Sequence, residues 1–270
     1  MKALWTVARL LLCVSGLFGA SAIGQAGEKT AQTPSGHGSS NPVLVELFTS
    51  EGCSSCPPAD EFVRKLDQLQ PVAHAQLIVL SEHVDYWDHE GWKDPYSSPE
   101  LTDRQAAYEH VLGLNSPYTP QLIVDGGSEI HLTDRQQIEK AFQQAAATPK
   151  ISVLLDGVSI DTANPRLLRA HVAADADTAK NSADVYLAIA LDHAESQVLR
   201  GENGGRHLVH TAVVLQLVKI GKLEKGKNFA QDVKVQLKPG VDPHILRVIA
   251  FVQTPGPGKL LGAALWKSAH

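Results

Sequence analysis

Residues 45–60 read VELFTSEGCSSCPPAD, and this stretch carries the strongest indication of the fold. It begins within an apolar run, residues 43–49, whose β-branched and aromatic side chains predict a buried strand. The cysteine pair is followed by two prolines and two acidic residues, which predicts the start of a helix. Proline in a first turn loses only amide donors that have no helical partner, and carboxylates there suit the helix dipole. The sequence therefore places Cys53 and Cys56 where a loop enters a helix.

The segments that follow extend this pattern into an α/β domain over residues 42–149. Residues 76–81, QLIVLS, form a second apolar run, and the order strand, helix, strand predicts a parallel pair. A later helix is expected to begin with a capping box in which Thr133 is followed three residues later by Gln136. The remaining expected elements are a helix at 102–112, a strand at 121–124, a tight turn at 125–127 and a strand at 129–131.

The pattern of apolar and polar residues changes from residue 150 onward. Apolar and polar residues alternate in short runs separated by turn residues, and no helical period is sustained. This pattern is typical of an antiparallel β-sandwich of six or seven strands, which we expect over residues 150–270. The clearest runs are 151–160, 167–174, 183–191, 211–220, 232–238 and 245–253.

The first 22 residues have the three parts of a signal peptide. Lys2 and Arg9 supply positive charge, an apolar stretch begins at Leu10, and Ala20-Ser21-Ala22 is a cleavage pattern. A membrane anchor that stays uncut is the alternative, but the apolar run is short for a span. Cleavage near Ala22 predicts a secreted or periplasmic protein. Small polar residues at 23–41 predict a flexible linker, and no later apolar run approaches the ~20 residues of a membrane span.

The composition excludes several classes of protein. Among 270 residues, 29 are acidic and 24 basic, and the net charge of -5 argues against a nucleic-acid binder. Hydrophobic residues make up 43%, enough for a packed core.

Of three cysteines, Cys13 falls in the signal peptide, so the exported chain keeps only Cys53 and Cys56. Secreted disulfide scaffolds carry more cysteines, and a bridge closing so short a loop stabilises little. The pair therefore calls for a chemical explanation.

A thiol at a helix N-terminus is stabilised as the thiolate, which is the attacking species in disulfide exchange. We predict that Cys53, nearer the surface, is the nucleophile and that Cys56 is the buried resolving thiol. If Pro57 is the first helical residue, however, Cys56 becomes the N-cap residue and the helix dipole stabilises a thiolate at Cys53 less. An inert bridge and a metal site are the alternatives, although one Cys-x-x-Cys supplies only two of the four ligands zinc usually takes.

Several segments resemble known families. VELFTSEGCSSC is similar to glutaredoxin-like and thioredoxin-like proteins, and residues 119–126, TPQLIVDG, resemble their cis-proline loop and hairpin. Together with residues 83–108, these blocks resemble the secreted family named domain of unknown function 1223 (DUF1223), and GENGGRHLVH at 201–210 extends the likeness. The resemblance implies a thioredoxin-like fold for the first domain and supplies no established reaction.

The resemblance also implies roles for three residues. By analogy Pro120 is cis and packs against the cysteines, and the backbone of Thr119 pairs with a bound chain. Glu46 lies seven residues before Cys53, whereas thioredoxins place a buried acid six before. Either Glu46 takes the proton of the resolving cysteine, or it points elsewhere, since a slip of one residue reverses the faces of a strand.

The stretch after the second predicted strand holds further candidates. In a parallel sheet, ligands bind beyond the carboxyl ends of the strands, where Cys53 also lies. A protonated His83 there would favour the Cys53 thiolate, and the aromatic side chains could hold a peptide or apolar substrate. Alternatively, the aromatics cover the core, and His83 pairs with Asp85 at the rim. The candidates are His83, Asp85, Tyr86, Trp87 and Trp92.

A glycine-rich loop in the second predicted domain precedes two more candidates. Arg206 and His210 could fold back onto the cysteine site, or the loop could be a solvated connection between strands.

The sequence as a whole predicts an exported thiol–disulfide oxidoreductase that needs no cofactor. Its partners would be exported proteins or small thiols as substrates, and a separate redox partner. Two alternatives remain. The first is copper delivery by Cys53, Cys56 and His83, because Cu(I) suits two thiolates and an imidazole. The second is a non-catalytic binding module in which the cysteines only close a turn.

Overall fold

A computed structural model describes residues 40–176 and 181–268 of the chain. The predicted signal peptide, residues 1–22, and most of the predicted linker, residues 23–41, lie outside the described residues. No helix within the described ranges is long and apolar enough to cross a bilayer.

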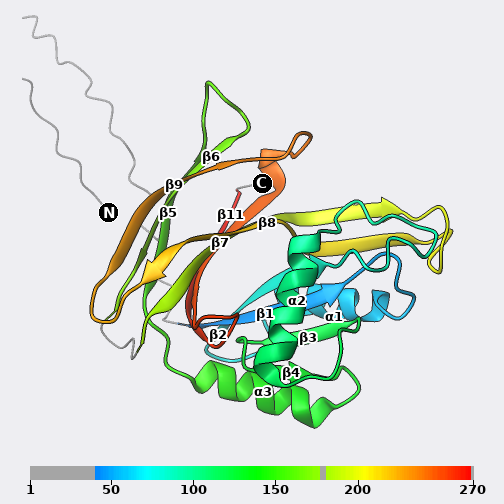
Figure 1. Ribbon diagram of the computed structural model, residues 1–270, viewed down its shortest axis with the longest axis horizontal. Helices are drawn as coiled ribbons and strands as arrows, with labels where there is room; N and C mark the ends of the chain where they lie inside the picture. Colours follow the sequence, from blue (N-terminus) through cyan, green and yellow to red (C-terminus); the bar gives the residue numbers. More distant parts are fainter. Residues whose placement is uncertain (1–39, 177–180, 269–270) are drawn as a thin grey trace, which may run out of the picture. The chain divides into compact units, whose positions relative to one another are not determined.

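Eight strands form one mixed sheet, which crosses the structure as Figure 1 shows. Its order is β11 (Leu260–Lys267), β10 (Leu246–Gln253), β7 (Ala183–Gln197), β8 (His207–Leu223), β2 (Ala75–His83), β1 (Asn41–Thr49), β3 (Gln121–Val124) and β4 (Ser128–Ile130). β1 and β2 are parallel, as the βαβ pattern predicts, and β8 joins β2 in parallel at Ser81 and Val213. Strands from both sides of the predicted boundary at residue 149 therefore share one sheet.

Three strands form a second, antiparallel sheet, and three α-helices complete the fold. The second sheet has the order β5 (Val153–Ile160), β6 (Leu167–Ala174) and β9 (Phe229–Gln236). The helices are α1 (Pro57–Leu69), α2 (Pro99–Leu112) and α3 (Arg135–Ala147), with a short 3₁₀ turn η1 (Pro243–Ile245). The described chain is thus a mixed α/β protein with a large and a small sheet.

The alternation of β1 decides which helix lies on which face of the large sheet. Val45 and Leu47 pack in the apolar cluster that contains buried residues of α1 and α3. Leu44 and Phe48 point to the opposite face, where the buried residues of α2 lie. Figure 1 shows α2 in front of β1 and β3, with α1 behind the sheet. Cys53 and Cys56 follow β1 directly, so they lie at the end of the sheet where α1 begins.

The second sheet packs on β7 and β10 through a third apolar cluster. Val172 of β6 and Val235 of β9 contribute to it, as do Val185 of β7 and Val248 of β10. The six predicted runs all become strands, and the seventh strand in this part of the chain is β11.

One local prediction is wrong by a single residue. The N-cap of α3 is Asp134, not Thr133, and its carboxylate accepts a hydrogen bond from the Gln137 backbone N–H at 2.9 Å. Aspartate ranks above threonine as an N-cap residue, and this helix begins at Arg135 accordingly.

Candidate functional site

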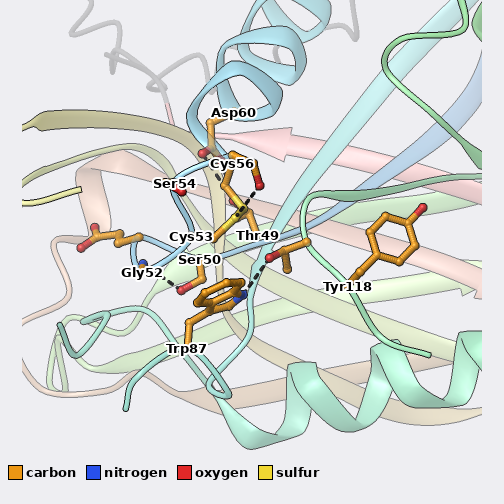
Figure 2. The surroundings of a disulfide bond; sticks show 12 residues. Thr49, Ser50, Gly52, Cys53, Ser54, Cys56, Asp60, Trp87 and Tyr118 are labelled. Atoms are coloured by element: carbon orange, nitrogen blue, oxygen red, sulfur yellow. Dashed lines mark hydrogen bonds between the residues drawn. A yellow bond between two sulfur atoms is a disulfide. The ribbon is translucent and has the colours of Figure 1, made fainter. Parts of the chain in front are cut away.

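Cys53 and Cys56 form a disulfide at the start of α1, with their Cα atoms 5.4 Å apart. Figure 2 shows its surroundings. Helix α1 begins at Pro57 and Cys56 is its N-cap residue, so the alternative in which Cys56 lies closer to the dipole is the one observed. Residues 50–56, called the Cys loop below, turn through hydrogen bonds from Cys53 N–H to Ser50 O and from Cys56 N–H to Cys53 O, both 3.2 Å long.

Both cysteines are completely buried, whereas Ser54 and Ser55 between them are exposed. The prediction that Cys53 lies near the surface is therefore wrong for this arrangement of the chain. A second segment of the chain contributes to this burial, because it hydrogen-bonds to the backbone of the Cys loop at Glu51, Cys53 and Ser54. Residues 198–206, called the capping loop below, connect β7 to β8 and lie directly on it.

Asn203 holds the capping loop in place. Its side-chain amide donates to the backbone carbonyls of Glu51 and Cys53, both at 2.9 Å, and the residue is fully buried. Beside it, the Glu202 carboxylate accepts a hydrogen bond from Ser54 N–H at 3.1 Å. This hydrogen bond lowers the pKa of Glu202. Arg206, a sequence candidate, reaches the Cys loop only indirectly, because its guanidinium donates to Asn203 Oδ1.

His210 enters the site from β8, which bends at Ala212, a non-glycine residue with a φ of 54°. Its Nε2 lies 3.4 Å from Glu51 Oε1 and its Nδ1 lies 3.6 Å from Asp60 Oδ1. Burial opposes protonation of His210, but the carboxylates of Asp60 and Glu51 outweigh it and raise its pKa to about 10. Asp60 lies in the first turn of α1 and accepts a hydrogen bond from Thr49 Oγ1 at 3.1 Å (Figure 2). A buried imidazolium therefore joins carboxylates located before and after the cysteine pair.

His83 lies against His210, with the two ring centroids 4.8 Å apart. Its Nδ1 pairs with Asp94 Oδ2 at 2.7 Å, so the alternative in which His83 pairs with Asp85 is not the one observed. Burial disfavours the charge on Asp94, but the His83 ring and the N–H groups of Glu51 and Tyr96 outweigh it and lower the pKa of Asp94. Nε2 of His83 and both ring nitrogens of His210 are buried, with no hydrogen-bond partner among the described residues.

Two of the aromatic candidates, Trp87 and Trp92, contact the Cys loop. Trp87 Nε1 donates to Thr119 Oγ1 at 2.8 Å, and its Cβ lies so close to Gly52 that a methyl group on that glycine would sit 2.9 Å away (Figure 2). Trp92 donates to Glu51 Oε2 at 2.7 Å. The Thr119–Pro120 peptide bond is cis, as the resemblance to thioredoxin-like proteins implies.

Glu46 points to the opposite face of the large sheet from Thr49 and Asp60. Its carboxylate accepts hydrogen bonds from the guanidinium of Arg104 and the hydroxyl of Tyr108 on α2. The structure thus does not bring Glu46 to the cysteines.

Two more residues lie on this α2 face. Burial raises the pKa of Glu82 well above its ordinary value, which Arg104 only partly offsets. Asp85 accepts from Thr102 Oγ1 at 2.7 Å, on the same side.

The described residues contain no group of three or more histidine, cysteine, aspartate or glutamate side chains arranged to hold a metal ion. The alternative ligand set of Cys53, Cys56 and His83 is not assembled, because both sulfurs are engaged in the disulfide.

Sequence reasoning missed four residues that contact the Cys loop or its ion pairs. Asp60 could have been found, because an acid in the first turn of a helix is visible in the sequence. Asn203 and Glu202 become functional candidates only through the fold, since about 150 residues separate them from the cysteines. Asp94 likewise becomes a candidate only through the fold, because no local pattern links it to His83, which precedes it by 11 residues.

Solved structures provide one strong likeness. A protein of Agrobacterium tumefaciens, AGR_C_4864, is 27% identical, with 86% of this chain and 96% of that chain covered and a TM-score of 0.67. A domain of the outer membrane lipoprotein Omp28 from Porphyromonas gingivalis is 13% identical over 44% of this chain and 88% of its own, and its TM-score of 0.29 carries no argument.

A search of curated proteins finds no match. The family whose description is "protein of unknown function (DUF1223)" matches residues 44–253, which is most of the chain and includes both the Cys loop and the capping loop. This chain therefore belongs to the DUF1223 family.

Proposed function

We propose that this protein is an exported thiol–disulfide oxidoreductase whose reactive group is the Cys53–Cys56 disulfide. The observation that carries the proposal is the position of the disulfide: it forms at the N-terminus of α1, between Glu51 and Asp60, whose carboxylates flank the buried ring of His210. Helix dipole and positive charge both stabilise a thiolate, which is the leaving group when a disulfide is attacked.

The local architecture supports the same function. Strand β1, the Cys loop, α1 and the parallel strand β2 are followed by a cis-proline before β3, which is the order expected of a thioredoxin-like unit. We infer this arrangement for residues 42–149, with the sandwich-like packing of the second sheet in residues 150–270. The predicted signal peptide supports an exported location, where a disulfide persists.

The reaction balances as two sulfur exchanges. A substrate thiolate attacks Cys53 Sγ, a mixed disulfide forms, and Cys56 leaves as a thiolate with the electron pair of the broken bond. A second substrate thiolate then attacks the substrate sulfur of the mixed disulfide, and Cys53 leaves. The substrate gains a disulfide, and the pair is reduced by two electrons. A separate redox partner carries out the reverse exchange, and a substrate disulfide would be reduced by the same steps in reverse.

The test is the reduction potential of Cys53–Cys56, measured by equilibrating the exported form in glutathione buffers and tagging free thiols. A value between about -120 and -270 mV, the range of exchange catalysts, is expected. A value below about -300 mV would contradict the proposal, because such bridges resist reduction by glutathione.

Two variants in the same buffers test the roles of the two sulfurs. Cys56→Ser should accumulate a glutathione adduct on Cys53, because the resolving thiol is missing. Cys53→Ser should accumulate much less, because the N-cap position of Cys56 makes its thiolate the better leaving group and its mixed disulfide is cleaved more readily. Equal adduct formation in the two variants would overturn the assigned roles.

A further inference from the structure

We propose that Asn203 is a positioning residue of this exchange reaction: it fastens the capping loop over the Cys loop, and attack on the disulfide requires the capping loop to lift. The inference rests on the proposed function and assigns a step that controls access to the same site.

The burial of the disulfide makes such a step necessary. Exchange requires an attacking sulfur to reach one sulfur of the bond in line with the other. Cys53 and Cys56 are both 0% exposed, so no thiol can reach either in the closed arrangement. Within the Cys loop only Ser54 and Ser55 are exposed, so the rest of this loop is covered together with the cysteines.

Asn203 is the principal attachment of the capping loop to the Cys loop. Both protons of one amide are used, one on Glu51 O and one on Cys53 O, and the side chain is fully buried. The acceptors are backbone carbonyls and not sulfurs. The attachment should therefore be equally strong whether the cysteines are oxidised or reduced.

A second attachment lies at the exposed edge. Glu202 accepts from Ser54 N–H at 3.1 Å, and the side chain is exposed. Next to it, Gly201 packs so closely against Trp92 that a methyl group on the glycine would lie 3.1 Å from the Trp92 Cβ. The capping loop thus rests on Trp92 and is fastened at Glu202 and Asn203.

The capping loop can lift as a unit because hydrogen bonds between its own residues hold it together. Val198 N–H donates to Arg206 O, and Gly205 N–H donates to Val198 O. Arg206 is bound to Asn203 by both its backbone and its guanidinium. None of these hydrogen bonds involves the Cys loop, and Leu199 at the outer end is 74% exposed. Lifting therefore breaks the contacts of the capping loop to the Cys loop and to residues 90–92.

The experiment compares the rate and the equilibrium of disulfide reduction by dithiothreitol in the full chain and in Asn203→Ala. Loss of two hydrogen bonds should increase the open population, and with it the reduction rate, by about 10- to 100-fold. Reoxidation by oxidised dithiothreitol should accelerate by the same factor. The equilibrium constant should change by less than about twofold, because the attachment does not distinguish the two redox states.

Two further variants keep the test decisive. Asn164→Ala removes an asparagine from the distant β5–β6 turn and should leave both rates unchanged. Glu202→Ala changes an exposed side chain, which preserves the fold, and should accelerate both directions by a smaller factor than Asn203→Ala. Glu202→Ala also serves if Asn203→Ala does not fold.

Wild-type rates in both a folded Asn203→Ala variant and Glu202→Ala would overturn the proposal. An equilibrium constant that shifts by the same factor as the reduction rate would also overturn it, because Asn203 would then stabilise the oxidised state instead of controlling access. Failure of the proposed function is a separate result, since dithiothreitol can reduce a disulfide whose potential lies below the range of exchange catalysts.

Discussion

At the scale of single residues, the main feature is a set of buried ionisable groups beside the disulfide. Glu51, Asp60 and Asp94 surround the rings of His83 and His210, and all five side chains are buried. Buried carboxylates are stable only when they are paired or hydrogen-bonded. The carboxylates of Asp60 and Glu51 raise the pKa of His210 to about 10, which favours a positive charge on this histidine at neutral pH.

Replacing His210 with glutamine should therefore produce a loss of stability that depends on pH. The pKa of His210 is about 10 in the folded state and 6.5 in the unfolded state. Its protonation therefore contributes its full share of the folding free energy below pH 6.5, and this contribution is lost as the pH rises through 10. The stability difference between wild type and variant should fall by at most about 1.4 kcal/mol per pH unit across this window. Urea unfolding at several pH values measures it.

His193→Gln is the matched control, because His193 is a half-exposed histidine on β7 that pairs with Glu195. Its effect should be small at every pH. A His210→Gln difference that stays constant from pH 6.5 to 10 would show that His210 is not the proton-binding group.

At the scale of elements, helix α3 tests how precisely a sequence pattern locates a helix end. Thr133 and Gln136 fit the capping-box spacing, but Asp134 and Gln137 fit it equally well one residue later. The structure uses the second pair: Asp134 Oδ1 accepts from Gln137 N–H, and α3 begins at Arg135.

Asp134→Ala should destabilise the protein by about 1 kcal/mol, because the helix loses its N-cap acceptor. Thr133→Ala should change the free energy of unfolding by much less, since the structure gives its side chain no capping bond to α3. Thermal or urea unfolding of the two variants measures the difference. Equal effects would favour the capping box expected from the sequence.

Strand β8 is the element that connects the two halves of the chain. Its Val213 pairs with Ser81 of β2, and its beginning carries His210 into the site. The capping loop lies immediately before it. The predicted second domain therefore supplies both the buried histidine, from β8, and the capping loop, from the segment before it.

At the scale of the whole molecule, the large sheet makes residues 40–149 dependent on the rest of the chain. Leu44 and Ile78 share an apolar cluster with Ala188, Val214 and Phe251, which lie on β7, β8 and β10. The described residues accordingly form one compact unit. Without β8, the edge of β2 and this apolar face would be exposed to water.

A fragment of residues 40–149 should therefore fail to fold cooperatively. It should lack a sharp thermal transition in near-ultraviolet circular dichroism, although it contains Trp87 and Trp92 as probes. A fragment of residues 40–268 is the control and should melt cooperatively. A cooperative transition in the short fragment would show that the boundary expected at residue 149 separates two independent domains.

The sequence alone determined the local structure around the cysteines. Apolar runs, the two prolines after Cys56 and the first-turn acid predicted β1, α1 and β2, because these signals act over a few residues. The resemblance to thioredoxin-like proteins added the cis bond at Pro120. Their positions in the sequence also identified His83 and His210 as candidates, although Asp94 was not recognised as the partner of His83.

Only the tertiary structure decided what surrounds the disulfide. Strand alternation predicts which residues of a strand share a face of the sheet, but not which side chains that face contacts. The partners of Glu46, Arg104 and Tyr108 on α2, are therefore known only from the structure. Asn203 contacts Cys53 across 150 positions of sequence, and no local pattern encodes such a contact. Burial of the disulfide likewise depends on the tertiary structure, because the capping loop that contacts the Cys loop connects β7 and β8 of the large sheet.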